Sequence, residues 1–254
     1  MAAIRSSLLI LALLLAGGEA RSAAPPKDRA AACTERTFEG ARFTACRYDS
    51  RRDELLLALD DGRTPLRSFE RLKRWLGPRA GRLLFAMNAG MFEISGAPVG
   101  LYVENGTEKH RINRRSGFGN FHMLPNGVFA VDERGTVAVV PSEEWPPSGF
   151  RTRWATQSGP MLVIDGRLHP QIQPNGTSLY VRNGVGVADP HNAWFVISDE
   201  PVSFGRLARF FRDALGCRNA LYFDGSVASL WEPDAGREDA ASQLGPLVAV
   251  MGRR

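Results

Sequence analysis

Short apolar runs alternate with small polar turns along most of the chain, a pattern typical of buried strands joined by tight connections. Asn105-Gly106 follows one of these runs and is a strong hairpin signal. Residues 128–131 and 136–140 are expected to form another hairpin, and further strands are expected within 36–60. The apolar runs lie at 83–87, 99–103, 161–164, 194–197, 220–223 and 247–251.

Two segments have the spacing of amphipathic helices instead. The first is predicted to begin with Thr64 as N-cap and Pro65 in its first turn, and to end at Gly77. The second is predicted to begin at Ser203 and to end at Gly216. Few helices separate the strands, so a doubly wound parallel sheet is not expected. The sequence predicts a single-domain α+β fold: a large twisted mixed β-sheet with a few helices packed on it.

The N-terminal segment has the features of a secretory signal. Arg5 gives a positive start, 8–16 is a short apolar run, and small residues follow. We interpret 1–23 as a signal peptide, cleaved after Ala20, Ala23 or Ala24, with an uncleaved anchor as the alternative. Residues 24–32 are then a disordered leader and 33–254 the folded domain. This predicts a periplasmic or secreted protein with no stable membrane insertion after cleavage.

Two of the three cysteines are placed to form a disulfide bond. If Glu39-Gly40 is a two-residue hairpin loop, Cys33 falls opposite Cys46 at a non-hydrogen-bonded position. The Cα atoms at such a position lie about 4.5 Å apart, which a disulfide can bridge. An oxidising compartment permits the bond. Cys217 lies in an apolar segment and is expected to be a buried free thiol.

Composition narrows the range of partners. The chain has a net charge of +5, and its arginines are scattered without interleaved aromatic residues. Nucleic acid is therefore not expected as a partner, whereas polyanionic glycans and anionic envelope surfaces are compatible with the charge. The sequence has no zinc-ligand spacing, no Gly-x-Ser-x-Gly elbow and no dinucleotide loop, so no cofactor or metal is expected. Its four isolated histidines are His110, His122, His169 and His191.

Several apolar runs end in polar turns that could form a sugar site. These turns are 88–90, 198–199 and 224–226, and 157–159 precedes another run. Carboxylates can act as nucleophile or base at an anomeric carbon, and arginine can clamp a phosphate. Taken singly, each motif is also explained as an ordinary turn. The candidate polar residues are Asn88, Glu104, Gln157, Arg182, Asp199 and Asp224.

The order of these motifs resembles the phosphodiester glycosidase domain family over roughly residues 45–252. This family includes the lysosomal uncovering enzyme, which removes N-acetylglucosamine from masked mannose-6-phosphate. The chain is most similar to its bacterial YigE-like branch, described as exopolysaccharide-biosynthesis proteins. The motifs that carry the resemblance are Asn88-Ala89-Gly90-Met91-Phe92, 100–106, Ser158-Gly159-Pro160 with Asp165-Gly166, Arg182 before 185–187, and Asn219-Ala220-Leu221 with Asp224-Gly225-Ser226.

The resemblance implies an α+β fold with a glycan site at its strand ends, and cleavage of a sugar-1-phosphodiester with release of the sugar. Asp224 is then base or nucleophile, Arg182 the phosphate contact, and Glu104 and Asp199 reserve carboxylates. The segment after Asp224 departs from the glycine triplet of the family, which changes what fits beside it. The remaining substrate-binding residues are expected to be Asn88 and Gln157 for hydroxyl groups, Ser158 and Ser226, and Gly90, Gly159 and Gly225 for backbone access.

Two other functions stay open from the sequence. One is hydrolysis of an ordinary glycosidic bond, which the same carboxylates would serve. The other is a non-catalytic glycan-binding protein of the polysaccharide machinery. The type of product separates the first alternative from phosphodiester cleavage, and binding without turnover would indicate the second.

Overall fold

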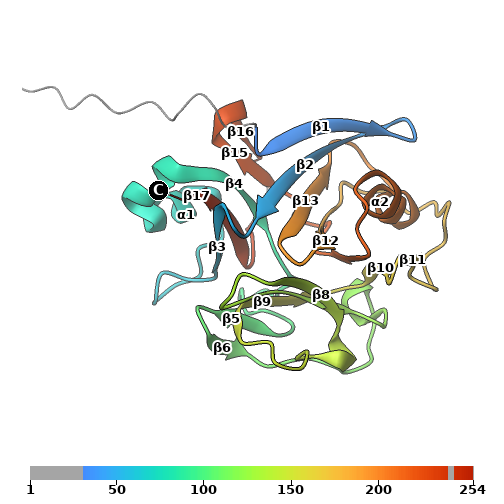
Figure 1. Ribbon diagram of the computed structural model, residues 1–254, viewed down its shortest axis with the longest axis horizontal. Coiled ribbons are helices and arrows are strands. Elements are labelled where there is room, and N and C mark those ends of the chain that lie inside the picture. Colours follow the sequence, from blue (N-terminus) through green and yellow to red (C-terminus); the bar gives the residue numbers. More distant parts are fainter. Residues whose placement is uncertain (1–30, 240–242, 254) are drawn as a thin grey trace, which may run out of the picture. The chain divides into compact units, whose positions relative to one another are not determined.

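The structure, a computed structural model, describes residues 31–239 and 243–253 (Figure 1). The predicted signal peptide 1–23 lies outside the described residues, as does most of the predicted leader 24–32. Within the described part of the chain, no helix is long and apolar enough to cross a membrane.

The described strands form three sheets, one of seven strands and two of five. The first sheet has the order β1 (Cys33–Phe38), β2 (Ala41–Asp49), β13 (Asn192–Ser198), β12 (Asn183–Asp189), β14 (Asn219–Tyr222), β10 (Met161–Ile164) and β11 (Arg167–Leu168). The second has the order β16 (Arg237–Glu238), β15 (Leu230–Glu232), β4 (Leu83–Asn88), β17 (Leu247–Gly252) and β3 (Asp53–Ala58). The third has the order β6 (Thr107–His110), β5 (Tyr102–Glu104), β9 (Thr152–Ser158), β7 (Gly127–Asp132) and β8 (Val137–Pro141).

The α+β class and the single domain are confirmed, but the strands are arranged differently from the expected single mixed sheet. All pairings between the described strands are antiparallel. In hairpins such as β1–β2 and β7–β8 the tight turn imposes this direction, because a parallel pair needs a long crossover connection. The predicted hairpins at 105–106 and 132–135 are present as β5–β6 and β7–β8.

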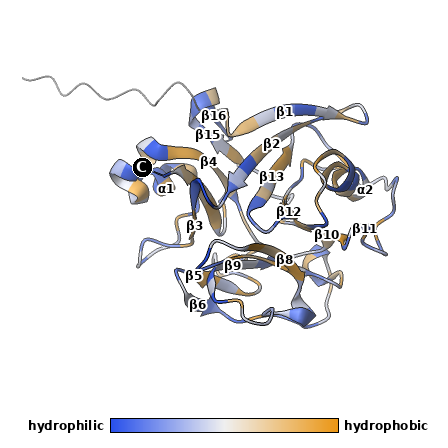
Figure 2. Ribbon diagram, viewed as in Figure 1, coloured by the Kyte–Doolittle hydropathy of each residue, from blue (hydrophilic) through white to orange (hydrophobic). Residues whose placement is uncertain are grey.

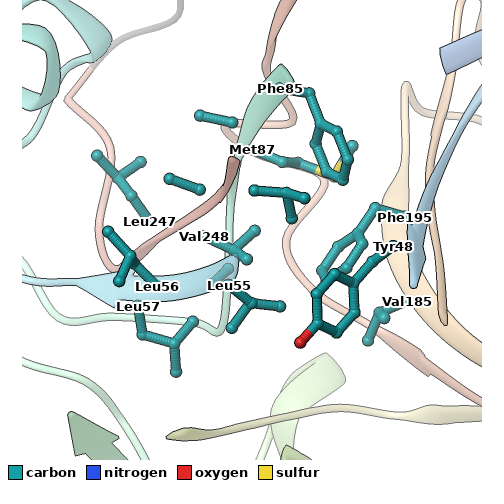
Figure 3. Packing of buried hydrophobic residues seen from close by; sticks show 14 of the residues in the cluster. Tyr48, Leu55, Leu56, Leu57, Phe85, Met87, Val185, Phe195, Leu247 and Val248 are labelled. Atoms are coloured by element: carbon teal, nitrogen blue, oxygen red, sulfur yellow. The ribbon is translucent and has the colours of Figure 1, made fainter. Parts of the chain in front are cut away.

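One phenylalanine from each of the three sheets contributes to a cluster of aromatic rings in the core. The ring of Phe195 on β13 lies 5.5 Å from that of Phe85 on β4 and 5.4 Å from that of Phe129 on β7, measured between centroids. All three side chains are fully buried. Figure 3 shows Phe85 and Phe195 facing one another, with Leu55 and Val248 nearby. Pairs of this kind stabilise a fold by about 0.5–1.5 kcal/mol beyond the area they bury.

Both predicted helices are present, and the first begins later than expected. α1 (Phe69–Leu76) has Ser68 as its N-cap, whose side chain accepts a hydrogen bond from the Arg71 amide. Thr64 lies instead in a turn, because the Asp61 carboxylate accepts from its amide at 2.8 Å. The second helix, α2 (Phe204–Arg209), is capped by Ser203 and continues as a π-helical turn (Phe210–Ala214). Short 3₁₀ segments span Gly77–Arg82, Asn120–His122, Ser142–Glu144 and Pro233–Ala235.

The β1–β2 hairpin has the predicted register and disulfide. Cys33 pairs with Cys46, and a disulfide joins them. Glu39 and Gly40 form the two-residue loop, both with positive φ, at 49° and 77°. Most side chains of β1 are exposed, and in Figure 2 hydrophilic colours run along much of the strand. The disulfide therefore ties an otherwise weakly packed edge strand to the sheet. Cys217 is a buried free thiol, as expected.

Candidate functional site

The expected polar residues come together where the ends of strands from all three sheets meet. Asn88 ends β4 in the second sheet, and Ser158 ends β9 in the third. Asn183 begins β12 in the first sheet, and Asp224 follows the neighbouring strand β14. Asn88, Ser158 and Asp224 therefore lie in one region of the structure.

Two buried asparagines hold these strand ends together. Asn183 Nδ2 donates to Asn88 Oδ1 at 2.8 Å, and Asn88 Oδ1 also accepts from the Ser229 amide at 2.9 Å. Asn183 Oδ1 accepts from the Asp224 amide at 3.2 Å, while Asn88 Nδ2 donates to the Asp224 carbonyl at 3.4 Å. Both asparagine side chains are buried. The position of the Asp224 backbone is therefore fixed from both sides.

Ser158 and Gln157 are fully engaged within the protein. Ser158 Oγ donates to the Phe223 carbonyl at 2.7 Å and so links the third sheet to the Asp224 turn. Gln157 Oε1 accepts from the amides of Leu101 and Asn113, each at 2.9 Å. Both side chains are buried, and Gln157 holds the loops around the site together through these hydrogen bonds.

The three expected glycines allow close packing within the protein. A Cβ atom at Gly90 would lie 2.4 Å from the Gln157 carbonyl oxygen, and one at Gly159 would lie 2.8 Å from the Phe121 carbonyl oxygen. At Gly225 it would lie 2.2 Å from the hydroxyl oxygen of Tyr222. Gly90 and Gly159 thus bring protein segments together, whereas Gly225 also lines a cavity.

The Asp224 carboxylate lies in the turn that follows β14. Its Oδ1 accepts a hydrogen bond from the Ser226 amide at 2.9 Å. Burial raises the pKa of the Asp224 carboxyl above its usual value, and the hydrogen bonds with Ser226 oppose this shift in part. No described cation forms an ion pair with it. A carboxyl with a raised pKa is suited to proton transfer near neutral pH.

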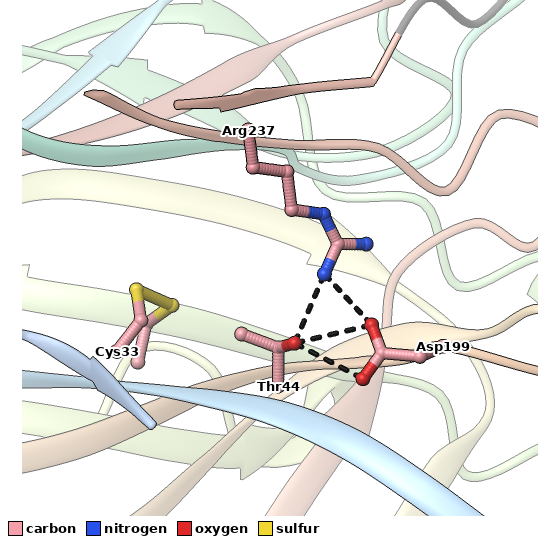
Figure 4. Close-up of a disulfide and its surroundings, with 5 residues drawn as sticks. Cys33, Thr44, Asp199 and Arg237 are labelled. Atoms are coloured by element: carbon pink, nitrogen blue, oxygen red, sulfur yellow. Dashed lines mark hydrogen bonds and ion pairs between the residues drawn. A yellow bond between two sulfur atoms is a disulfide. The ribbon is translucent and has the colours of Figure 1, made fainter. Parts of the chain in front are cut away.

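A cavity of about 420 Å³ lies beside this turn and is lined by Gly225, Ser226, Asp199 and Arg237. Arg237 Nη1 donates to Asp199 Oδ1 at 2.7 Å and to Thr44 Oγ1 at 2.9 Å, as Figure 4 shows. The rest of the guanidinium pairs with Asp239 through two hydrogen bonds of 3.0 Å. Asp199 is thus held in an ion pair at the cavity wall, which differs from the environment of Asp224.

Arg182 lies in a different environment from the expected phosphate contact. It precedes β12 directly and does not lie in a turn between two strands. Its side chain is buried, with Nε donating to the Val202 carbonyl at 2.9 Å and Nη2 to the Ser178 carbonyl at 3.1 Å. The guanidinium carbon lies 3.7 Å from the ring centroid of Phe204, and Nη1 is 3.4 Å from the Tyr222 hydroxyl. The Arg182 guanidinium therefore packs beside the Tyr222 hydroxyl and is itself buried.

Glu104 is separate from the network around Asp224. Its carboxylate accepts from the Tyr102 hydroxyl at 3.2 Å and pairs with Lys109 at 3.3 Å. Burial raises the pKa of Glu104, and Lys109 opposes the shift. No described hydrogen bond joins Glu104 to Asn88, Asn183 or Asp224, so the structure does not bring this reserve carboxylate to the site.

Sequence reasoning missed Asn183, Arg237 and Tyr222. Asn183 and Gly184 have the composition of a turn, and nothing local distinguishes an asparagine that starts a buried strand. Arg237 lies on a two-residue strand with no apolar periodicity, and its partner Asp199 is 38 positions away in the chain. The apolar run at 220–223 predicted the strand that carries Tyr222. It could not predict that the Tyr222 hydroxyl lies against Gly225.

Comparison with known proteins agrees with the resemblance found in the sequence. A family model described as phosphodiester glycosidase matches residues 81–234, which include Asn88, Asn183 and Asp224. The uncharacterized protein YigE of Escherichia coli (strain K12) is 38% identical over 157 residues. The aligned region spans 59% of this chain and 59% of that relative.

Two solved structures share the fold at low sequence identity. The catalytic domain of zebrafish N-acetylglucosamine-1-phosphodiester alpha-N-acetylglucosaminidase, auto-inhibited by its pro-peptide, aligns with a TM-score of 0.59 and 14% identity. The alignment covers 87% of this chain and 82% of that one. A hypothetical protein from Synechocystis aligns with a TM-score of 0.50 and 16% identity, over 87% of this chain and 61% of that one.

Proposed function

This chain belongs to the phosphodiester glycosidase family, and on that premise we propose that it hydrolyses a sugar-1-phosphodiester and releases the sugar. The observation that carries the proposal is the environment of Asp224. Its carboxyl is partly buried, has a raised pKa, and is followed by two residues that line a cavity of about 420 Å³. That volume is within the range of small-molecule sites, about 300–1,000 Å³.

In the proposed reaction, Asp224 acts as general base toward a water molecule. The water oxygen forms a bond to the anomeric carbon, and Asp224 accepts the proton that the water loses. The bond between the anomeric carbon and the phosphate oxygen breaks, and its electron pair leaves with the phosphate as a phosphomonoester. Because this leaving group already carries negative charge, it needs no strong general acid. Direct attack by Asp224 on the anomeric carbon, followed by hydrolysis, gives the same products.

Hydrolysis of an ordinary glycosidic bond is a second candidate, favoured by the state of the two arginines. Arg182 is buried, and Arg237 is already paired with Asp199 and Asp239. Neither guanidinium is therefore free to neutralise a phosphate in the present geometry. An uncharged leaving group would not require such a cation, but it would require a second carboxyl as general acid. Asp199, which lines the cavity, is the candidate for that role.

We further propose that the protein is exported and acts on envelope glycan or exopolysaccharide. The charged start, apolar run and small residues of 1–24 support export, and so does the Cys33–Cys46 disulfide. Fractionation of a producing bacterium tests this proposal. The protein is expected in the periplasm or medium with an N-terminus after Ala20, Ala23 or Ala24, and full-length protein in the cytoplasm would contradict it.

A product assay tests the activity and separates the candidates. The purified exported protein is incubated with glycosyl 1-phosphodiesters of both anomeric configurations and with the p-nitrophenyl glycosides of the same sugars. Free sugar and phosphomonoester in equal amounts support the proposed reaction, whereas turnover of the p-nitrophenyl glycosides alone supports the second candidate. Binding of these compounds without any turnover would indicate a non-catalytic glycan-binding protein.

A further inference from the structure

A second cavity, of about 370 Å³, lies at the opposite ends of strands that reach the candidate site. β9 runs from Trp154 in this cavity to Ser158 beside Asp224, and β17 runs from Leu247, paired with Asn88, to the residue before Arg253. The four steps from Trp154 to Ser158 correspond to about 13 Å of strand. Residues from all three sheets line this cavity, and none of them lines the first one.

The acidic side chains around this cavity already have partners. Four acids line it, and each accepts a hydrogen bond or forms an ion pair with another group. These contacts are Asp53 with the Asp49 amide at 3.0 Å, Glu54 with Arg82 at 3.4 Å, Asp132 with the amides of Arg134 and Thr136 at 2.9 and 2.7 Å, and Glu133 with Arg151 at 3.9 Å. Glu54 and Glu133 are thus paired with arginines outside the cavity lining, whereas Asp53 and Asp132 accept hydrogen bonds from backbone amides.

Three arginines of the same cavity have no acidic partner among the described residues. Arg134, Arg153 and Arg253 line the cavity, are exposed, and form no ion pair with a described residue. Arg253 is held in place because its Nε and Nη2 donate to the carbonyls of Asp53 and Ser50, at 3.1 and 2.9 Å. A guanidinium has five N–H donors, so Arg253 keeps donors for an additional acceptor. The cavity thus has available positive charge.

The cavity also has an aromatic wall with an available hydroxyl group. Trp154 and Tyr48 line it and are otherwise buried, and the Arg153 guanidinium lies 5.8 Å from the Trp154 ring. Figure 3 shows the Tyr48 ring beside Phe195 in the apolar core. Tyr48 is 3% exposed to solvent, and its hydroxyl makes no hydrogen bond to a described residue. The Tyr48 hydroxyl is not among the described buried polar atoms that lack a partner, so it is open to the cavity and can form a hydrogen bond with a ligand oxygen.

From this combination we infer that the cavity is a binding site for an acidic sugar, one bearing a carboxylate or phosphate group. Arg153 and Arg253 bind the anionic group, since guanidinium groups form paired hydrogen bonds to such oxygens. The Tyr48 hydroxyl binds a sugar oxygen, and Trp154 provides an apolar surface for the ring. The size of the cavity suits one small molecule and not a nucleic acid groove. This inference does not rest on the proposed function.

Calorimetry and NMR with defined sugars test the inference on the intact exported protein. D-glucuronate and D-glucose 6-phosphate are the probes, with D-glucose as the neutral match and inorganic phosphate as the simple anion. Both acidic sugars are expected to bind at least tenfold more tightly than glucose or inorganic phosphate. The Trp154 indole signal, assigned with Trp154→Phe, and the amide signals of 50–55 and 131–135 are expected to shift on binding.

Two arginine variants make the test specific. Arg153→Ala is expected to weaken binding of both acidic sugars at least tenfold, and it should fold because its exposed side chain makes no hydrogen bond to a described residue. Arg63→Ala is the matched control: Arg63 is exposed, forms no ion pair with a described residue, and does not line the cavity. The inference fails if no acidic sugar binds, if phosphate binds equally tightly, or if both variants bind like wild type.

Discussion

Asn183 Nδ2 donates to Asn88 Oδ1 at 2.8 Å, a bond that joins the seven-stranded sheet to the five-stranded sheet that contains β4. Each of the two side chains also bonds to the Asp224 backbone. Because amides both donate and accept, one pair can serve four backbone and side-chain partners in a buried position. The site is therefore built on this asparagine pair, and the catalytic carboxylate proposed here is positioned by it.

Asn183→Ala should destabilise the protein. It leaves the Asp224 amide and Asn88 Oδ1 with fewer partners, and a buried unsatisfied group costs about 1–3 kcal/mol. Chemical denaturation should show a loss of that size, and turnover should fall as well because the Asp224 turn loosens. Asn175→Ala, at an exposed position, is the control and should change neither quantity. Equal stability of Asn183→Ala and wild type would contradict the role given to the pair.

Arg182→Lys distinguishes a buried support from a phosphate contact. Lysine cannot donate to both the Val202 and Ser178 carbonyls in the geometry of the guanidinium, nor stack on Phe204 in the same way. We expect a loss of about 1–3 kcal/mol in the free energy of unfolding. Arg36→Lys makes the same exchange at an exposed arginine over Trp194 and should cost less than about 0.5 kcal/mol.

Kinetics give the second half of this test. A role as support predicts a lower melting temperature together with a change mainly in kcat. A rise in KM for a phosphodiester at unchanged melting temperature would show instead that Arg182 contacts the phosphate.

The sequence predicted the strands and the polar residues at their ends better than it predicted the contacts of each side chain. The apolar runs before Asn88 and Asp224 identify β4 and β14 because burial imposes local composition. Gln157 has the same composition signal but is satisfied by the backbone amides of Leu101 and Asn113, which are distant in sequence. The pairing of Arg237 with Asp199 likewise depends on chain folding. Local pattern specifies the elements, while these contacts depend on three-dimensional register.

Loss of the Cys33–Cys46 disulfide should destabilise the protein measurably. The two cysteines are 13 positions apart, and cross-linking a loop of this length stabilises by about 3 kcal/mol. The double variant Cys33→Ala, Cys46→Ala should lose about 2–4 kcal/mol in chemical denaturation. A reductant should lower wild type to a similar stability and leave the double variant unchanged. Detection of three alkylatable thiols in denatured, unreduced exported protein would show that the bond is absent.

Stability should depend on pH through Asp224. Burial raises its pKa in the folded state, so the folded protein retains this proton at a pH where the unfolded chain, with a pKa near 3.9, has lost it. The contribution of Asp224 is thus fully favourable below about pH 4 and declines as pH rises through the folded-state pKa. Asp224→Asn removes this decline. The stability of the variant relative to wild type should therefore increase from pH 4 to pH 7, and a constant difference would contradict the raised pKa.

Asp224→Asn should abolish most of the turnover without unfolding the protein. Asparagine keeps the carbonyl oxygen that accepts the Ser226 amide hydrogen bond, and its backbone keeps the contacts with Asn88 and Asn183. It cannot accept a proton from water or attack an anomeric carbon. A loss of about a hundredfold or more in kcat is expected, the scale of general acid–base or nucleophilic help.

The Asp165-Gly166 turn provides a matched control for this substitution. Asp165 is followed by glycine, as Asp224 is. Unlike Asp224, Asp165 has a positive φ of 47° and a side chain that is 76% exposed. Asp165→Asn should leave both kcat and the melting temperature unchanged. If Asp224→Asn unfolds the protein, its carboxylate is required for the turn. If it folds and retains turnover, the base must be another carboxylate, and Asp199 at the cavity wall is then the residue to substitute next.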